Sequence, residues 1–199
     1  KKPAMLREIK DVLSLLKNNS LLMYLILLAL VTTLLTMPTR TLFAPYASEN
    51  LSGGALQVGL MLASIGGGAL LGTLIAASIP QNSKKGKYIL ITSIISGFSI
   101  LFLGFSSITI FSIFICFFLG LGDAGRRSLN PSLIIEKTPA EYRGRVMGFY
   151  AMSFGFIPIG AIPMGIIADK YGVDISFIFS GIALIIFTIL LSNRKVIKS

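Results

Sequence analysis

A stripe of polar side chains interrupts one of the most apolar parts of the chain. Its members recur at steps of three and four residues, so a helix would carry them on one face; they are Asp123, Arg126, Arg127 and Asn130. A charged side chain near the centre of a membrane helix costs about 2.5–3.5 kcal/mol on insertion scales, and it is tolerated where it faces a wet cavity or a charged partner. The stripe is therefore our candidate for contact with a substrate or a coupling ion.

Two simpler interpretations of this stripe stay open. Asp123 can pair with Arg127 on its own helix and only steady the bundle. Arg126 or Arg127 can also extend to the inner lipid headgroups, because both lie past the middle of a long apolar stretch. One arginine balances the charge of Asp123, and the sequence shows no mate for the second.

Arg40 is another isolated charge, late in an earlier apolar segment, where it follows Pro38 and has threonines on both sides. It can extend outward towards Glu49, or it can bind an anionic group in a cavity. Both interpretations are predictions of the sequence, since a guanidinium group can serve either purpose.

Other kinds of chemistry are not expected. The chain has no histidine and a single cysteine, Cys116, which lies in an apolar run. Without histidine or paired cysteines we predict no metal site and no nucleophile of the Ser/His or Cys/His type. We therefore expect no catalytic residue, no cofactor and no enzyme activity.

Six apolar stretches must position the polar residues, and each approaches the roughly 20 residues that a spanning helix needs. They cover residues 20–43, 55–79, 88–105, 108–135, 146–167 and 174–192. Hydrophobic residues make up 54% of the chain and charged residues 13%, whereas about a quarter of the residues in soluble proteins are charged. The mean hydropathy is +0.83. The fold class predicted is an all-α membrane protein with six transmembrane helices.

The charged residues between these stretches predict the topology. The net charge is +10, and the basic residues form short clusters in alternate connections. They are Lys1, Lys2, Arg7, Lys10 and Lys17 before the first stretch, Lys84, Lys85 and Lys87 after the second, Lys137, Arg143 and Arg145 after the fourth, and Arg194, Lys195 and Lys198 at the end. By the positive-inside rule, both termini are cytoplasmic in the cell membrane. Anionic lipid, rather than nucleic acid, is the expected partner of these clusters.

The ends of the chain are expected to lie outside the bundle of residues 20–192. Residues 1–19 are predicted to form a cytoplasmic amphipathic linker helix, because Leu6, Ile9, Leu13 and Leu16 recur at helical steps opposite basic residues. A plain helical linker is the alternative. Residues 193–199 are predicted to be a cytoplasmic tail.

Two triplets of spans suggest an internal repeat. The second and fifth stretches are both rich in small residues, and an odd number of spans per unit makes the two units inverted, as in many secondary transporters. Gly68 and Gly72 give the second stretch a flat strip for a neighbouring helix. Pro158 and Pro163 should bend the fifth, as a hinge or only for fit.

Several motifs make the chain resemble the major facilitator superfamily of transporters. Gly120–Gly122 and Pro139–Gly148 resemble the signature of the fourth and tenth helices and the Arg-Gly-Arg turn that ends it. Phe154–Gly160 and Gly165–Gly172 look like the eleventh helix and its outer loop, and Leu6–Asn18 looks like the linker before the seventh. The resemblance covers essentially the whole chain, as the C-terminal half of a twelve-helix fold, and is nearest to drug, macrolide and siderophore exporters.

The chain departs from the family pattern in three places. The proline expected midway along the signature helix is displaced to Pro131, and Cys116 and its neighbours stand where the family often has an arginine. The loop Gln81–Lys87 lacks the acid of the corresponding family loop. The resemblance therefore transfers no proton-coupling role to Arg126 or Arg127.

The resemblance implies a function for the polar residues. In that fold the first and fourth helices of each half line the central cavity, and these helices carry Arg40 and Asp123 here. Asp123 is then the candidate for protonation or cation contact, and Arg40 and Arg127 are candidates for substrate charge. The turn Arg143-Gly144-Arg145 is expected to be an inner gate contact with the other half, or to set topology alone.

The function predicted is the C-terminal half of an exporter of drugs or small metabolites that works by alternating access and is coupled to protons. Its expected partners are a small-molecule substrate, the bilayer, and the missing N-terminal six-helix half or a second copy. The alternative is a six-span membrane scaffold or partner subunit that transports nothing. A membrane enzyme is the weakest candidate.

Overall fold

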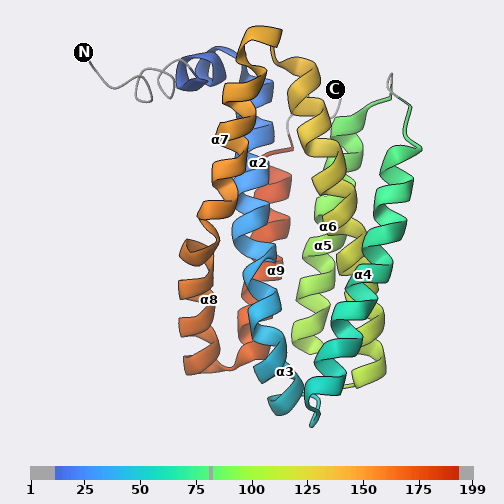
Figure 1. Ribbon diagram of the computed structural model, residues 1–199. Coiled ribbons are helices and arrows are strands. Elements are labelled where there is room, and N and C mark those ends of the chain that lie inside the picture. The colour runs from blue at the N-terminus through green and yellow to red at the C-terminus, as the bar shows by residue number, and fades with distance from the viewer. Residues whose placement is uncertain (1–11, 81–82, 193–199) are drawn as a thin grey trace.

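The computed structural model describes residues 12–80 and 83–192 of the chain, and its elements there are helices joined by short connections (Figure 1). A short helix over residues 12–18 comes first. The elements after it are α2 (Ser20–Thr36), η1 (Pro38–Leu42), α3 (Phe43–Glu49), α4 (Ala55–Ala77), α5 (Lys85–Phe105), α6 (Thr109–Lys137), η2 (Ala140–Tyr142), α7 (Arg143–Gly155), α8 (Ile157–Tyr171) and α9 (Val173–Leu190). The predicted all-α fold class is confirmed.

Six helical segments of the described chain are long and apolar enough to cross a membrane. They are Ser20–Glu49, Ala55–Ala77, Lys85–Phe105, Thr109–Lys137, Ala140–Tyr171 and Val173–Leu190. Each overlaps one predicted stretch. The first and fifth segments run further than predicted, because the polar residues at their ends, such as Glu49 and Arg143, are also helical.

Two of the segments are broken helices. In the first, Pro38 has no backbone N–H to donate, and the chain passes through the 3-10 turn η1 between α2 and α3. In the fifth, α7 ends at Gly155 and α8 begins at Ile157, so the break lies just before Pro158. α8 continues past Pro163 as one helix.

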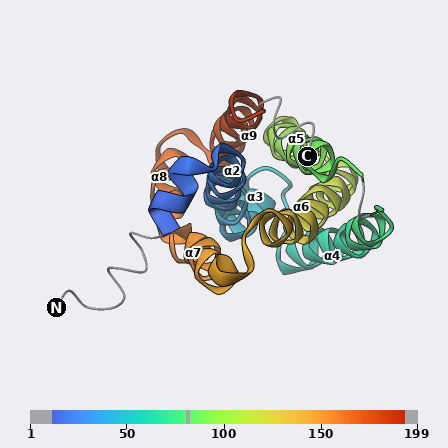
Figure 2. The same cartoon turned by 90° about the horizontal axis from the view of Figure 1, so that it is seen from above.

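The six spans pair as two inverted triplets. The second span of each triplet packs beside the first span of the other: α4 lies along α6, while α7 and α8 lie along α2 and η1. The third spans, α5 and α9, pack against each other. Figure 2 shows α2 and α6 at the centre, flanked by α7 and α8 on one side and by α4 on the other. This arrangement is that of inverted three-helix repeats, as the sequence predicted.

Glycine allows the closest of these helix contacts. A Cβ atom at Gly68 or Gly72 on α4 would collide with the backbone carbonyl of Phe117 or Leu121 on α6. In the matching contact of the other triplet, a Cβ at Gly160 on α8 would collide with a carbonyl of α2. Helix backbones can approach this closely only where side chains are absent.

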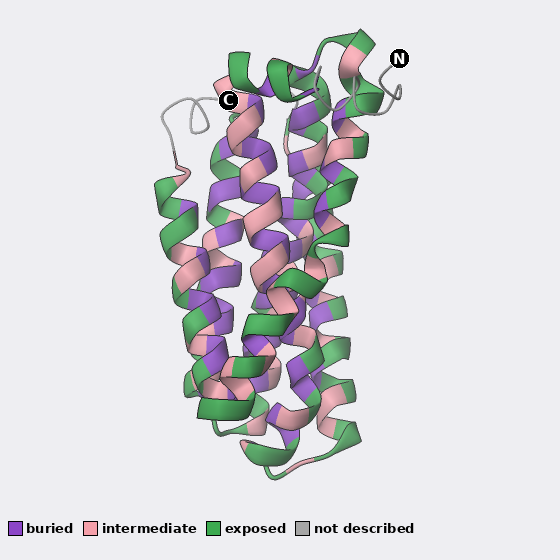
Figure 3. Ribbon diagram, turned by 90° about the vertical axis from the view of Figure 1, so that its left-hand side faces the viewer, coloured by how far each residue is buried: buried purple, intermediate pink, exposed green. Residues whose placement is uncertain are grey.

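Two apolar clusters fill the bundle, one above and one below its middle. The first gathers residues such as Leu25, Leu133 and Val146 near the end where α2 begins, and the second gathers Tyr46, Ile100 and Phe177 near the opposite end. Large apolar side chains also cover the outside, where Figure 3 shows exposed residues along the helices. An apolar exterior suits a lipid surround.

The connections divide between two ends of the bundle. Successive spans run antiparallel, so the starts of α2, α5 and α7 share one end, with Lys17, Lys87 and Arg143 there (Figure 1). The opposite end carries Glu49 and Asp169. In the helix before α2, Val12 and Leu16 are buried while Leu13 is exposed. The rest of the predicted linker helix, and the predicted tail, lie outside the described residues.

Surface labelling tests which end faces the cytoplasm. In a Cys116→Ser background, the positive-inside rule predicts that a membrane-impermeant maleimide labels Glu49→Cys and Asp169→Cys in intact cells. Lys87→Cys and Arg143→Cys should react only after the membrane is opened. All four parent residues are exposed in the structure. Labelling of Lys87→Cys and Arg143→Cys from opposite sides would contradict the fold itself.

Alanine at Gly72 tests the contact between α4 and α6. The added methyl must push the backbone of Leu121 away, and overpacking of this kind typically costs about 1–3 kcal/mol. The measurement is reversible unfolding in mixed micelles. Gly59→Ala on the same helix is the matched control, because its Cβ meets nothing within 4 Å and the substitution should favour the helix. Equal stability of the two variants would rule out this contact.

Candidate functional site

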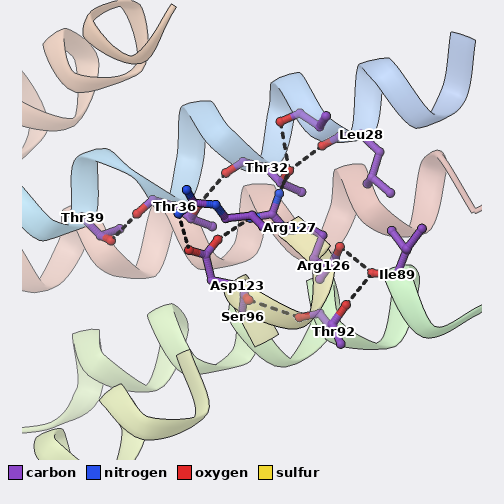
Figure 4. Close-up of polar contacts among 12 residues, drawn as sticks. Leu28, Thr32, Thr36, Thr39, Ile89, Thr92, Ser96, Asp123, Arg126 and Arg127 are labelled. Carbon is purple, nitrogen blue, oxygen red and sulfur yellow. Dashed lines mark hydrogen bonds and ion pairs between the residues drawn. The ribbon is translucent and has the colours of Figure 1, made fainter. Parts of the chain in front are cut away.

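Asp123 on α6 lies at the centre of a cluster of three arginines. Its Oδ2 accepts a hydrogen bond from Nη2 of Arg40 at 3.1 Å and lies 3.5 Å from Nη1 of Arg127. Its Oδ1 accepts a hydrogen bond from Nη2 of Arg126 on the same helix. The Asp123 side chain is 4% exposed. Figure 4 shows it between α2 and α6 with Arg126 and Arg127 around it.

A threonine ladder on α2 forms the other wall of this cluster. Thr32 accepts a hydrogen bond from Nη1 of Arg126, and its own hydroxyl donates to the carbonyl of Leu28 at 2.6 Å (Figure 4). Thr36 donates to the carbonyl of Thr32 at 2.8 Å. Each hydroxyl bonds to its own helix and so keeps its polar atoms paired away from water. Thr32, as part of this ladder, is the hydroxyl through which Arg126 contacts α2.

The three arginines differ in exposure. The Arg126 side chain is 3% exposed, whereas those of Arg40 and Arg127 are 37% and 42% exposed. The guanidinium of Arg127 also lies 5.7 Å from the ring centroid of Phe154 on α7, a cation–π contact. Arg126 is therefore an internal partner of Asp123, while the other two arginines also face outward.

Arg40 and Arg127 face a pocket of about 490 Å³ between η1, α4 and α6. Its polar lining is Arg40, Thr73, Asp123, Arg127 and Ser128, and the rest is small or apolar: Leu62, Ile65, Gly66, Ala69, Gly120 and Ala124. A second pocket of about 290 Å³ shares Thr73 and Ser128 with it and reaches Lys85 at the start of α5. The lining is mixed, with charged and hydroxyl groups beside small and apolar residues. A few polar groups that converge on one cavity are typical of a small-molecule site.

Asn130, the last residue of the stripe, lies one turn further along α6. It is buried, and its Nδ2 donates to the carbonyl of Leu25 on α2 at 3.2 Å. Within the described chain, its Oδ1 and the Nε of Arg126 have no hydrogen-bond partner. Asn130 thus links the same two helices but lies apart from the pocket lining.

The structure gives Arg40 a partner that the sequence did not identify. Its partner is the carboxylate of Asp123, whose side chain comes from the other triplet. The predicted contact with an anionic ligand stays a prediction. The predicted Asp123–Arg127 pair exists, as one of three contacts. The second arginine, for which the sequence showed no mate, shares the same carboxylate.

The other predicted residues lie outside this cluster. Arg143, Gly144 and Arg145 begin α7 at the basic end, where Nε of Arg143 donates to the carbonyl of Thr138 at 3.3 Å. Gly68 and Gly72 contact the α6 backbone, and Pro158 and Pro163 belong to α8. Their predicted gating roles remain predictions. Among the described residues, no group of three His, Cys, Asp or Glu side chains could hold a metal ion.

Sequence reasoning missed three interactions: the threonine ladder, one cation–π contact and one ion pair. Thr32 and Thr36 precede Arg40 at four-residue steps, a helical pattern that could have marked this face of α2. The contact of Phe154 with Arg127 has no such signal, because it joins two different spans. The third is an ion pair of 2.8 Å between Nζ of Lys85, 9% exposed, and Glu136 at the end of α6.

These features define the class of the protein. Inverted three-helix repeats with a polar cavity beside the first and fourth spans are a plan that recurs in secondary transporters. A solved structure, that of the POT family transporter PepTSo, has the same fold: the TM-score is 0.73 at 16% identity, over 86% of this chain and 36% of that one. The sequence model of the transmembrane secretion effector family matches residues 3–199. The chain belongs to this family of major facilitator transporters.

Two curated relatives are transporters. Macrolide efflux protein A of Streptococcus pyogenes is 26% identical over 186 residues, which is 92% of this chain and 46% of that protein. The staphyloferrin A transporter of Staphylococcus aureus is 29% identical over 167 residues, 82% of this chain and 40% of that protein. The chain thus spans about half the length of the relatives that it matches.

Removing the carboxylate tests what holds the cluster together. Asp123→Asn leaves the buried Arg126 without its anion, and breaking a buried ion pair typically costs about 3–5 kcal/mol. Unfolding in mixed micelles should show this loss, and Asp123→Asn with Arg126→Gln should lose less than the two single variants combined. Asp169→Asn, an exposed carboxylate at one end, is the control. A cost no larger than that of the control would mean that Arg126 does not depend on Asp123.

Proposed function

We propose that this chain forms one half of an exporter of drugs or small metabolites, and that its substrate binds in the pocket beside Asp123. The observation that carries the proposal is the cluster of one carboxylate and three arginines, at the level where α2 and α6 meet. Transport out of the cell is supported by the family, whose description is transmembrane secretion effector, and by a relative that is named an efflux protein. Alternating access by rocking two six-span halves is the mechanism expected for this architecture.

In this proposal, the Arg40–Asp123 ion pair is the contact that forms and breaks during transport. It joins the first span of one triplet to the first span of the other, and Arg40 is partly exposed, whereas Arg126 and Asp123 are buried on one helix. A proton on Asp123 would remove the charge that holds Arg40 and let α2 move relative to α6. This supplies a physical route for proton coupling through the chain's own residues.

The basic end is proposed to face the cytoplasm and to carry the gate. Arg143 and Arg145 are exposed at the first turn of α7, where they can contact acidic groups or helix C-termini of the other half. The Lys85–Glu136 ion pair ties α5 to α6 at the same end. The other half is either a further six spans or a second copy of this chain, placed in the cell membrane.

Export by the full-length transporter tests the proposal. Cells that express it should accumulate less of at least one compound from a labelled panel of anionic, neutral and cationic drugs than cells with an empty vector. A protonophore should abolish the difference. Arg40→Gln keeps the buried Asp123–Arg126 pair but breaks the contact between triplets, so export should fall by about tenfold or more, which corresponds to about 1.4 kcal/mol in rate.

Asp169→Asn, an exposed site at the opposite end, is the matched control and should export normally. Protein amounts in the membrane are compared by immunoblot, so that poor folding is not mistaken for lost transport. Export by Arg40→Gln at the wild-type rate would remove the cluster from the mechanism. Export that ignores the protonophore would remove proton coupling.

A further inference from the structure

Arg40 and Arg127 have far more hydrogen-bond donors than their shared partner can use. Each guanidinium group has five N–H donors. Arg40 donates to Oδ2 of Asp123, and Arg127 approaches the same oxygen at 3.5 Å, while the other oxygen is bound by Arg126. Both side chains are more than a third exposed and line the same pocket. Most of their donors are therefore available to a ligand there.

The net charge of the cluster also favours an anionic ligand. Three guanidinium groups surround one carboxylate, and among the described residues no other acidic side chain forms an ion pair with them. Two positive charges are left over at mid-span. A surplus of this kind attracts an anion and repels a cation, and the effect is strong where water is scarce.

The rest of the pocket limits the kind of anion. Apart from the charged cluster, the walls are mainly apolar or small, from Leu62 and Ile65 on α4 to Ala124 on α6. A ligand that fits them needs an apolar body as well as its anionic group. Nη2 of Arg40 and Nη1 of Arg127 both lie within 3.5 Å of one oxygen atom, so a single planar carboxylate can contact both.

We propose that the pocket binds an amphipathic carboxylate whose anionic group bridges Arg40 and Arg127 and takes over their contacts with Oδ2 of Asp123. This rests on the proposed function and names its substrate class. Asp123 keeps its buried contact with Arg126 when the ligand arrives, because that contact uses its other oxygen, Oδ1.

Three probes with one fluorescent body test this on the purified full-length transporter in detergent. Dansylglycine carries a carboxylate, its methyl ester is neutral, and dansylcadaverine carries an amine. Dansyl emission rises on entering an apolar site, and titration gives a Kd. The proposal predicts that dansylglycine binds about tenfold or more tightly than its ester, and that the amine binds most weakly.

Variants locate the binding site. Arg40→Gln and Arg127→Gln should each weaken dansylglycine by about tenfold and leave the ester unchanged, because only a charge contact is lost. Lys170→Gln, a cation at the far end of α8, is the control and should change nothing. An equal loss for acid and ester would show a structural effect and overturn the proposal. So would an ester that binds as tightly as the acid, tighter binding of the amine, or no binding of any probe.

The result separates this inference from the proposed function. Binding of dansylglycine by the wild-type protein without export of any cargo contradicts the exporter but leaves the anion site in place. Export of a panel compound with no preference for the carboxylate probe contradicts the anion site alone. If an acidic side chain of the other half occupies the two arginines, the acid and its ester bind alike, which also overturns the proposal.

Discussion

The carboxylate of Asp123, placed among three guanidinium groups inside an apolar bundle, is the interaction on which the arrangement depends. Lipid offers no water to solvate an isolated charge, so the helices that carry these groups must stay together. α2 brings the threonine ladder, η1 after it brings Arg40, and α6 brings Asp123 with Arg126. The two apolar clusters, one towards each end, separate this polar layer from the membrane surfaces.

The inverted repeat explains how that layer can exist at the centre. Each second span packs beside the first span of the other triplet, and glycines remove the side chains that would hold the backbones apart. Gly72 does this against α6, and Gly160 does it against α2. The first and fourth spans can therefore lie at the centre with their polar faces towards each other, while the second and fifth spans flank them.

The sequence predicts the spans well because hydropathy and length are local properties. It also predicts the stripe on α6, because Asp123 to Asn130 follow the helical period within one segment. The Arg40–Asp123 pair joins residues 83 positions apart, and no local period reports which spans become neighbours. The two prolines of the fifth span show a similar limit. Both predict a bend, but the helix breaks only before Pro158, and α8 continues past Pro163.

The cluster divides one carboxylate between two tasks. Oδ1 and Arg126 form a buried ion pair, and removal of either partner would leave the other charge buried without compensation. This contact therefore stabilises the fold. Oδ2 faces Arg40 and Arg127, whose exposed donors border the pocket, so this half can exchange partners without unfolding the bundle. The proposed exchange of charge contacts therefore leaves the anchor in place, because Arg126 is not among the contacts that change.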